Sequence, residues 1–245
     1  MKSCVIIPAR YKSSRLPGKP LVKLLDKEMI IWVAEISEKA VGKENVFIAT
    51  DDLRISKKVN EHGFNSIMTS SDLLTGTDRV AEASVDLDYE IFVNVQGDEP
   101  LIDYKDISRA IEFKKKFPFS IINSYCFLKN CENPNNKNIP KLVTNNNNDL
   151  IYISRAVIPN SKGEFAKKIN YKKQVCIYSY SKEELNQFLL FGKKSFIESI
   201  EDIEILRFFE FDKKIKMFEA TKSSLAVDVP SDIKAVEREL QKQLN

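Results

Sequence analysis

The stretch VIIPARYKSSRLPGKPL, residues Val5–Leu21, joins an apolar run directly to a loop that carries four cations. These are Arg10, Lys12, Arg15 and Lys19, and the three prolines of the stretch limit the freedom of the backbone around them. Several cations held on a stiff backbone suit a rigid ligand with several negative charges. The stretch therefore predicts a phosphate-binding loop after the first strand of a sheet, and a nucleoside triphosphate is the leading candidate ligand.

Short β-rich runs alternate with helical periodicity through the first half of the chain. This order predicts an α/β fold: a mostly parallel, doubly wound nucleotide-binding sheet with helices on both faces. Ligands of such sheets bind beyond the carboxyl ends of the strands, where the basic loop and the segments Thr50-Asp51-Asp52 and Gln96-Gly97-Asp98-Glu99 fall. We expect strands at Cys4–Ile7, Val46–Thr50, Ser66–Met68 and Ile91–Val95, and helices near Met29–Ala40, Leu53–Glu61 and Asp78–Ala83.

The second half of the chain is less regular, and its strands look more antiparallel. We see no internal repeat or long linker, so we expect one domain over residues 1–245, in which about 120–215 form an extension. The expected elements are strands at Ile121–Phe127, Lys141–Thr144, Leu150–Ile153, Val175–Tyr180 and Lys216–Glu219, and helices at Lys182–Leu190, at Ile203–Phe209 and from Ser231.

The composition excludes several classes of protein. A formal net charge of +3 over 245 residues does not favour a nucleic-acid partner. No apolar run reaches the roughly 18 residues that a membrane span needs, and the first residues lack the pattern of a signal peptide. Four cysteines without a CxxC pair and a single histidine disfavour a zinc site. We therefore expect a cytoplasmic protein without a membrane partner.

The basic loop does not match the pattern of P-loop ATPases, because Pro20 follows Gly18-Lys19. A solvated charged turn is the plain alternative, but the stiff backbone and the position after a strand favour phosphate binding. Asp98 follows one apolar strand, and Asp228 follows a second apolar segment near the end of the chain. Two carboxylates together with substrate phosphates would suit Mg²⁺, although a simple Gly-Asp turn is the alternative at Asp98.

Taken together, these motifs resemble those of the CMP-sugar synthetases, most closely the 3-deoxy-D-manno-octulosonate (Kdo) cytidylyltransferases. The resemblance runs from Cys4 to the final helix. It implies transfer of CMP from CTP to the anomeric hydroxyl of a 2-keto-3-deoxy sugar acid, with release of pyrophosphate. It also implies a Mg²⁺-dependent homodimer with a dimerisation and sugar-binding extension, and a product used for lipopolysaccharide or capsule if the acceptor is Kdo. The motifs that carry it are Ile6-Ile7-Pro8-Ala9-Arg10-Tyr11, Ser14-Arg15-Leu16-Pro17-Gly18-Lys19-Pro20-Leu21, Ala49-Thr50-Asp51, Thr75-Gly76-Thr77-Asp78-Arg79, Val93–Pro100, Ser154-Arg155-Ala156, Ile177-Tyr178, Leu206-Arg207 and Val227-Asp228.

The resemblance also implies roles for individual residues. Arg10, Lys19 and Asp98 would be catalytic, and Asp98 and Asp228 would hold Mg²⁺. The nucleotide would contact Pro8, Ala9, Arg10, Ser14, Arg15, Lys19, Thr50, Asp51, Ser70, Gly76 and Gln96. The sugar acid would contact Arg79, Gln96, Arg155, Gln174, Tyr178, Glu204 and Ile205.

Two positions depart from the family pattern. Gln174 stands where the family usually has a histidine, and Ile205 stands where it usually has a glutamine. Both positions would face the sugar acid, and a site built to bond a hydroxyl discriminates against analogues that lack it. Kdo is the default acceptor, while 8-amino-Kdo and a sialic-type acid stay open, and neutral drift is the plain alternative.

Two other classes of function are weighed against this one. A non-catalytic nucleotide-binding homologue would not need Lys19, Asp98 and Asp228 together. A glycosyltransferase would be expected to show an Asp-x-Asp metal motif after a strand. Asp86-Leu87-Asp88 has that spacing but precedes the strand expected at Ile91–Val95, so it is interpreted as a solvated turn.

Overall fold

The computed structural model describes residues 1–13, 15–163, 169–222 and 225–244. Its main sheet has the strand order β11-β7-β10-β6-β1-β4-β5. β1 pairs in parallel with both β4 and β6, and β10 pairs antiparallel with both β6 and β7. The strands are β1 (Ser3–Ala9), β4 (Val46–Thr50), β5 (Asn65–Met68), β6 (Ile91–Val95), β7 (Ile121–Phe127), β10 (Lys172–Ser181) and β11 (Ile215–Glu219).

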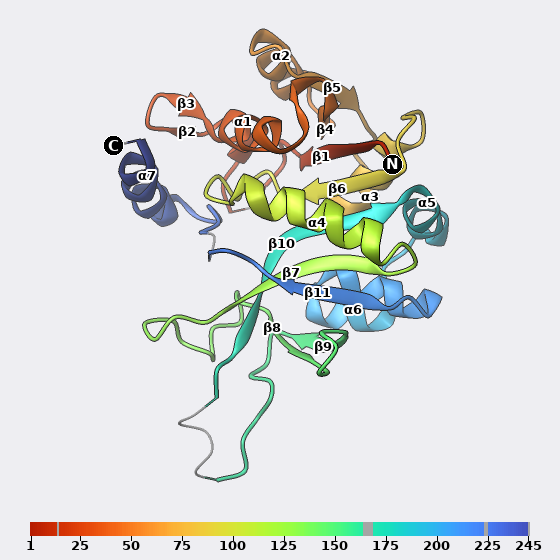
Figure 1. The fold of residues 1–245 in the computed structure, drawn as a ribbon. Helices are drawn as coiled ribbons and strands as arrows, with labels where there is room; N and C mark the ends of the chain where they lie inside the picture. Colours follow the sequence, from red (N-terminus) through yellow and green to blue (C-terminus); the bar gives the residue numbers. More distant parts are fainter. Residues whose placement is uncertain (14, 164–168, 223–224, 245) are drawn as a thin grey trace.

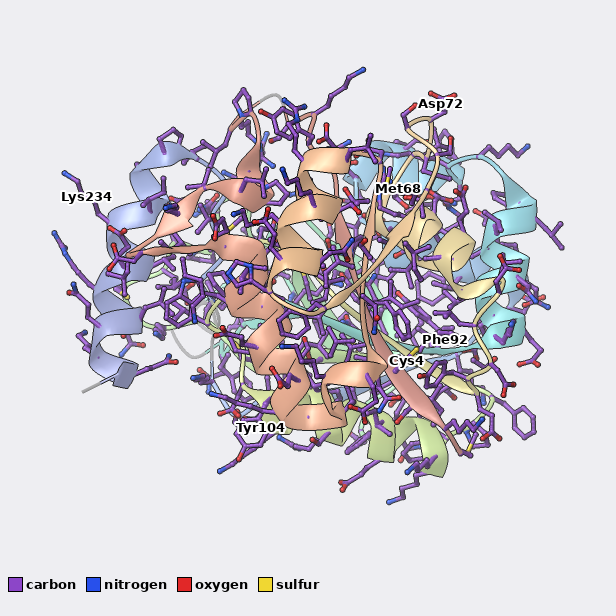
Figure 2. The ribbon with its side chains drawn as sticks, turned by 90° about the horizontal axis from the view of Figure 1, so that it is seen from above. Cys4, Met68, Asp72, Phe92, Tyr104 and Lys234 are labelled. Carbon is purple, nitrogen blue, oxygen red and sulfur yellow. The ribbon has the colours of Figure 1, made fainter. Side chains whose placement is uncertain are left out.

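Helices cover both faces of this sheet, so the predicted α/β, mostly parallel and doubly wound fold is confirmed (Figure 1). One buried cluster joins the sheet to α1 (Met29–Val41), α2 (Leu53–Glu61) and α4 (Tyr104–Lys116). A second cluster on the other face joins it to α3 (Gly76–Ser84), α5 (Lys182–Phe191) and the 3₁₀ segment η4 (Glu204–Phe211). The strands between the clusters are buried, as Cys4 and Phe92 on adjacent strands illustrate (Figure 2).

The extension predicted in the second half is the more antiparallel part of the structure. β8 (Lys141–Thr144) and β9 (Leu150–Ser154) form an antiparallel hairpin, and β8 also pairs with the start of β10. Figure 1 shows this hairpin below the main sheet, beside the long strands β7 and β10. α6 (Phe196–Glu201) follows α5 and leads into η4.

The last helix holds the chain end against the first hairpin. α7 (Pro230–Leu244) packs beside the hairpin of β2 (Lys23–Leu24) and β3 (Lys27–Glu28) (Figure 1). A third buried cluster contains Leu24 together with Val236 and Leu240 of α7. This packing carries the segment before α7 back to the loop that follows β1.

Two other 3₁₀ turns are η1 (Lys19–Leu21) and η2 (Lys43–Asn45).

Arg207 of η4 joins three elements from inside the protein. Its side chain is fully buried, and its guanidinium contacts Asp78 of α3 at 2.6 Å and Glu198 of α6 at 2.7 Å. The Arg207 Cζ atom also lies 3.8 Å from the centre of the Phe188 ring of α5. η4 is therefore fixed against α3, α5 and α6 by a buried network whose charges are paired.

The structure differs from the expected elements in a few places. The helix expected at Ile203–Phe209 is the 3₁₀ segment η4, and helices α4 and α6 and the β2–β3 hairpin were not expected at all. Their signals are present: Asp103 caps α4 through the backbone N–H of Lys105, and Ser195 with Glu198 forms a capping box on α6. None of the helices in the described residues is long and apolar enough to cross a membrane.

Candidate active site

A cavity of about 380 Å³ lies at the carboxyl ends of β1 and β6, where the fold predicts a ligand. It is strongly charged, and residues from several loops converge on it. Eleven of the residues expected at the site line this cavity: Pro8, Ala9, Arg10, Arg15, Lys19, Gly76, Arg79, Gln96, Asp98, Glu204 and Asp228.

The basic loop turns back on itself through Gly18. Gly18 has a left-handed φ of 66° and donates its N–H to the Tyr11 carbonyl at 3.0 Å. A Cβ atom at this position would lie 3.3 Å from the Tyr11 ring, so glycine suits both the backbone angle and the close contact. Pro20 then stands in the first turn of η1, which directs Lys19 into the cavity.

Lys19 lies between the two carboxylates predicted as metal ligands. Its Nζ atom is 2.5 Å from Asp98 Oδ2 and 3.5 Å from Asp228 Oδ1. Arg15 contacts the same Asp228 oxygen at 3.1 Å. The three residues predicted from separate motifs therefore meet at one place.

Backbone contacts hold the two aspartates together. The Val227 N–H donates to the Asp98 carbonyl at 2.9 Å, which joins the end of β6 to the segment before α7. Asp232, in the first turn of α7, accepts the N–H groups of Asp228 and Val229 at 2.9 and 3.0 Å. The first turn of α7 thus holds the backbone of Asp228 in place.

The donor set fits a hard cation that is shared with a ligand. Among the described residues, no group of three or more His, Cys, Asp and Glu side chains could hold a metal ion by itself. Asp98 and Asp228 both contact Lys19 Nζ, so two carboxylate oxygens are close together and turned toward the same space. Mg²⁺ is commonly held by one or two carboxylates with the remaining positions filled by phosphate oxygens and water. The arrangement fits such a site.

Glu204 forms a wall of the cavity and caps α3. Its carboxylate accepts the N–H of Gly76 at 3.0 Å and both the N–H and the hydroxyl of Thr77, at 2.8 and 2.6 Å. A carboxylate at a helix N-terminus is electrostatically favoured. Burial nevertheless raises the pKa of Glu204 above its ordinary value.

Arg79 of α3 is buried beside the cavity and is already paired. Its guanidinium lies 3.5 Å from Asp51 Oδ2 and donates to the Thr69 hydroxyl. Burial lowers the pKa of Arg79, and Asp51 opposes that shift. The Arg10 side chain differs, since it is exposed and makes no hydrogen bond or ion pair with another described residue.

A family model described as cytidylyltransferase matches residues 4–215. The chain belongs to the cytidylyltransferase family. The 3-deoxy-manno-octulosonate cytidylyltransferase 2 of Hydrogenovibrio crunogenus is 40% identical to it over 248 residues, which cover 97% of each chain. The 8-amino-3,8-dideoxy-manno-octulosonate cytidylyltransferase of Shewanella halifaxensis is 35% identical, covering 98% of this chain and 99% of that protein. A solved CMP:2-keto-3-deoxy-manno-octonic acid synthetase complexed with CTP superposes with a TM-score of 0.91 at 33% identity, over 99% of this chain and all of the other. The resemblance stated from the motifs is confirmed.

Several residues expected at the site of this cytidylyltransferase lie away from the cavity lining. Thr50 is buried at the end of β4, and Asp51 contacts Arg79 behind the cavity wall. Ser70 is exposed, and its N–H donates to Glu82 at 2.7 Å. Ser14 lies outside the described residues.

The two positions that depart from the family pattern are also outside the cavity lining. Ile205 is 1% exposed and packs in the second buried cluster, so its side chain does not reach the cavity surface. Gln174 on β10 donates to Asn123 Oδ1 at 3.0 Å. Tyr178 is buried on the same strand, where burial raises its pKa well above the ordinary value.

The Arg155 side chain of the cytidylyltransferase binds backbone carbonyl groups. It donates to the carbonyls of Glu201 at 2.6 Å, Asp202 at 2.9 Å and Lys137 at 2.9 Å. These contacts fill most of the donor capacity of one guanidinium. Arg155 therefore fastens the end of α6 and is absent from the cavity lining.

Other residues line the cavity without having been expected there. Thr75 could have been identified, because it caps α3 through the Asp78 N–H and stands in a quoted motif. Lys194 and Asp202 carry no local signal, and only the tertiary packing of α6 brings them to the cavity. The additional lining residues are Ser13, Pro20, Met29, Leu73, Leu74, Thr75, Gly97, Lys194 and Asp202.

The Asp-x-Asp sequence weighed for a glycosyltransferase lies at the other end of the sheet. Asp88 comes just before β6, whereas the cavity lies beyond its carboxyl end. The Asp88 side chain is 98% exposed and contacts Lys2 at 3.0 Å. The interpretation of this motif as a solvated turn is confirmed.

Proposed function

We propose that the protein transfers CMP from CTP to the anomeric hydroxyl of a 2-keto-3-deoxy sugar acid, with Kdo as the default acceptor, and releases pyrophosphate. The observation that carries this proposal is the convergence of Lys19, Asp98 and Asp228 at one end of a cavity. This convergence occurs in a chain that matches a CTP-complexed synthetase over almost its full length.

The proposed reaction needs positioning and charge more than a covalent role for the protein. The sugar oxygen attacks the α-phosphorus of CTP, the bond from that phosphorus to the β-phosphate oxygen breaks, and the hydroxyl proton leaves to solvent. Negative charge grows on the departing pyrophosphate, and cations placed there stabilise the transition state more than the ground state. We assign this role to Arg10, Arg15 and Lys19.

We propose that Asp98 and Asp228 hold Mg²⁺ when the triphosphate is bound. The ion would supply a positive charge shared between the carboxylates and the phosphate oxygens. Lys19 contacts both carboxylates in the structure, so its ammonium group would move from them toward the phosphates as the metal and nucleotide enter. We keep Arg10, Lys19 and Asp98 as the proposed catalytic residues.

The relatives of this chain differ in the acceptor that their names give. Curated relatives at similar identity act on 3-deoxy-manno-octulosonate or on its 8-amino analogue, as their names state. Gln174 and Ile205 would influence this choice through the packing around the cavity, because neither lines it. The 8-amino analogue is therefore the second candidate acceptor.

We also propose that the protein is a homodimer that works in the cytoplasm and supplies lipopolysaccharide or capsule assembly. Phe196 and Ile200 lie one turn apart on α6 with 78% and 68% of their surfaces exposed, which suits contact with a second copy. The four cysteines are free, as is usual for proteins of a reducing compartment.

The first experiment measures pyrophosphate release from CTP and Mg²⁺ with Kdo, 8-amino-Kdo and a sialic acid, using ATP and UTP as nucleotide controls. We expect release with CTP and Kdo, and Asp98→Asn should nearly abolish it while leaving the thermal unfolding profile unchanged. Release with another of these acids only would keep the mechanism and change the acceptor. No release with any acid would favour a non-catalytic homologue, and an Asp98→Asn enzyme that stays fully active would refute the role of Asp98.

A further inference from the structure

Lys194 and Asp202 form an ion pair on the wall of the cavity. Lys194 Nζ lies 2.8 Å from Asp202 Oδ1, and both residues line the same cavity as Lys19. They flank α6, since Lys194 precedes its N-cap and Asp202 is its C-cap. The two ends of α6 thus bring to the cavity a cation and an anion that belong neither to the proposed metal site nor to the basic loop.

The backbone of Asp202 is held in place while its side chain reaches solvent. The residue has a left-handed φ of 50°, and its N–H donates to the Glu198 carbonyl at 2.7 Å. Its own carbonyl accepts from Arg155 at 2.9 Å. The Asp202 side chain is 72% exposed, so its carboxylate can turn away without disturbing α6.

Cations surround the Asp202 carboxylate. Lys194 donates the closest contact, and the Arg155 guanidinium lies 3.8 Å from the second oxygen. Lys194 first, then Arg155 and Arg10, hold the pKa of Asp202 below its ordinary value. An environment that stabilises one carboxylate in this way suits another carboxylate of similar size.

We propose that Lys194 binds the carboxylate of the acceptor sugar acid, and that Asp202 occupies this place until the acceptor arrives. This proposal rests on the proposed function, because it assigns the acceptor subsite of the same cavity. The position agrees with the chemistry on two counts. First, the α6–η4 segment carries Glu204, which is expected at the sugar. Second, Arg15 and Lys19, which we assign to the triphosphate, lie at the other end of the cavity beside Asp98. A ligand ammonium group would be repelled by Lys194, Arg155 and Arg10, so an anion is favoured there.

The test compares Lys194→Met with Lys193→Met in pyrophosphate-release assays that vary CTP and acceptor separately. Lys193 is the matched control, because it is the adjacent lysine, is exposed and does not line the cavity. Loss of a charge-assisted hydrogen bond from Lys194 should raise KM for the acceptor by about tenfold or more, with KM for CTP changed by less than about twofold. Lys194→Arg should retain most of the acceptor affinity, and Lys193→Met should behave as the natural protein.

A second comparison uses the methyl ester of the acceptor, which lacks the negative charge. The natural protein should prefer the free acid over the ester, and Lys194→Met should reduce this preference about tenfold. Asp202→Asn should lower KM for the acid, since it removes the competing charge and keeps a side chain of similar size. An active Lys194→Met enzyme with the natural preference and the natural KM would overturn the proposal.

These outcomes separate the two proposals. If none of the acids causes the natural protein to release pyrophosphate, the proposed function fails and no preference for the free acid can be measured. If it turns over normally and Lys194→Met matches Lys193→Met, the proposed function stands and the acceptor-carboxylate site is refuted. Lys194→Met could also lose turnover because it is less stable, which a lowered melting temperature would reveal. In that case Lys194→Arg decides: if it fails to restore the acceptor KM, the proposal is refuted.

Discussion

Replacing Lys19 by methionine should remove the charge that serves both the carboxylates and the proposed leaving group. The Lys19 side chain is only 16% exposed, so water replaces little of its interaction. A unit charge about 4 Å from a phosphate oxygen, at an effective dielectric constant of about 20, is worth roughly 4 kcal/mol. Because Asp98 and Asp228 offset part of this charge, we expect Lys19→Met to lose about 3 kcal/mol of transition-state stabilisation. A loss of this size corresponds to a decrease of about 10²-fold in kcat/KM.

The assay is steady-state pyrophosphate release under saturating acceptor, with Lys12→Met as the matched control. Lys12 belongs to the same loop but is exposed and does not line the cavity. We expect a loss of about 10²-fold for Lys19→Met and almost none for Lys12→Met. A drop of less than about threefold in Lys19→Met would refute the electrostatic role given to Lys19.

The same variant should alter the binding of divalent cations in the absence of nucleotide. In the structure Lys19 contacts both aspartates, and Arg15 also contacts Asp228, so Mg²⁺ must displace the Lys19 ammonium group from between the carboxylates before it can bind. Lys19→Met removes this competitor, and calorimetric titration should show tighter Mg²⁺ binding to the variant than to the natural protein. Weaker binding by the variant would contradict this interpretation.

Three further predictions concern the stability and surfaces of the molecule. Arg207→Met leaves two buried carboxylates without their cation and should reduce the free energy of unfolding by about 3–5 kcal/mol in urea titrations, whereas Lys2→Met at an exposed pair should have no measurable effect. Thiol reagents should modify Cys131 alone in the folded protein, even at pH 9, because it is exposed and burial raises the pKa of thiols such as Cys4; a second reactive thiol would contradict this. Ile200→Asp should convert the proposed dimer to a monomer in analytical ultracentrifugation, and an unchanged dimer would place the interface elsewhere.

Features that depend on local pattern and strand ends could be predicted from the sequence. Lys19 lies in the loop that follows the apolar strand β1, and Asp98 lies three residues after the apolar strand β6. The parallel pairing of these two strands therefore brings both residues to one edge of the sheet. Asp228 needed the resemblance as well, because its position depends on α7 packing far along the chain. The convergence of these residues was predictable to this extent.

The acceptor side of the cavity was less predictable, since its residues are placed by tertiary contacts. An arginine such as Arg155 can bind a ligand or fasten backbone carbonyls, and the sequence does not distinguish these uses. Ile205 was expected at the sugar because of the motif around it. In a 3₁₀ turn, however, neighbouring side chains point in different directions, so Glu204 reaches the cavity while Ile205 enters the core.

The charges of the cavity are mostly paired with one another before any ligand binds. Lys19 is paired with Asp98, Lys194 with Asp202, and each of these cations faces a ligand anion in the proposed reaction. Substrate binding is therefore an exchange of ionic partners, in which only the difference between the old and new contacts contributes to affinity. Such an exchange weakens ground-state binding. Each cation is already held in position, however, so its side chain loses little conformational entropy when the substrate binds. Charge that develops on the departing pyrophosphate then meets groups that are already aimed at it, which is where binding energy is most effective in lowering the barrier.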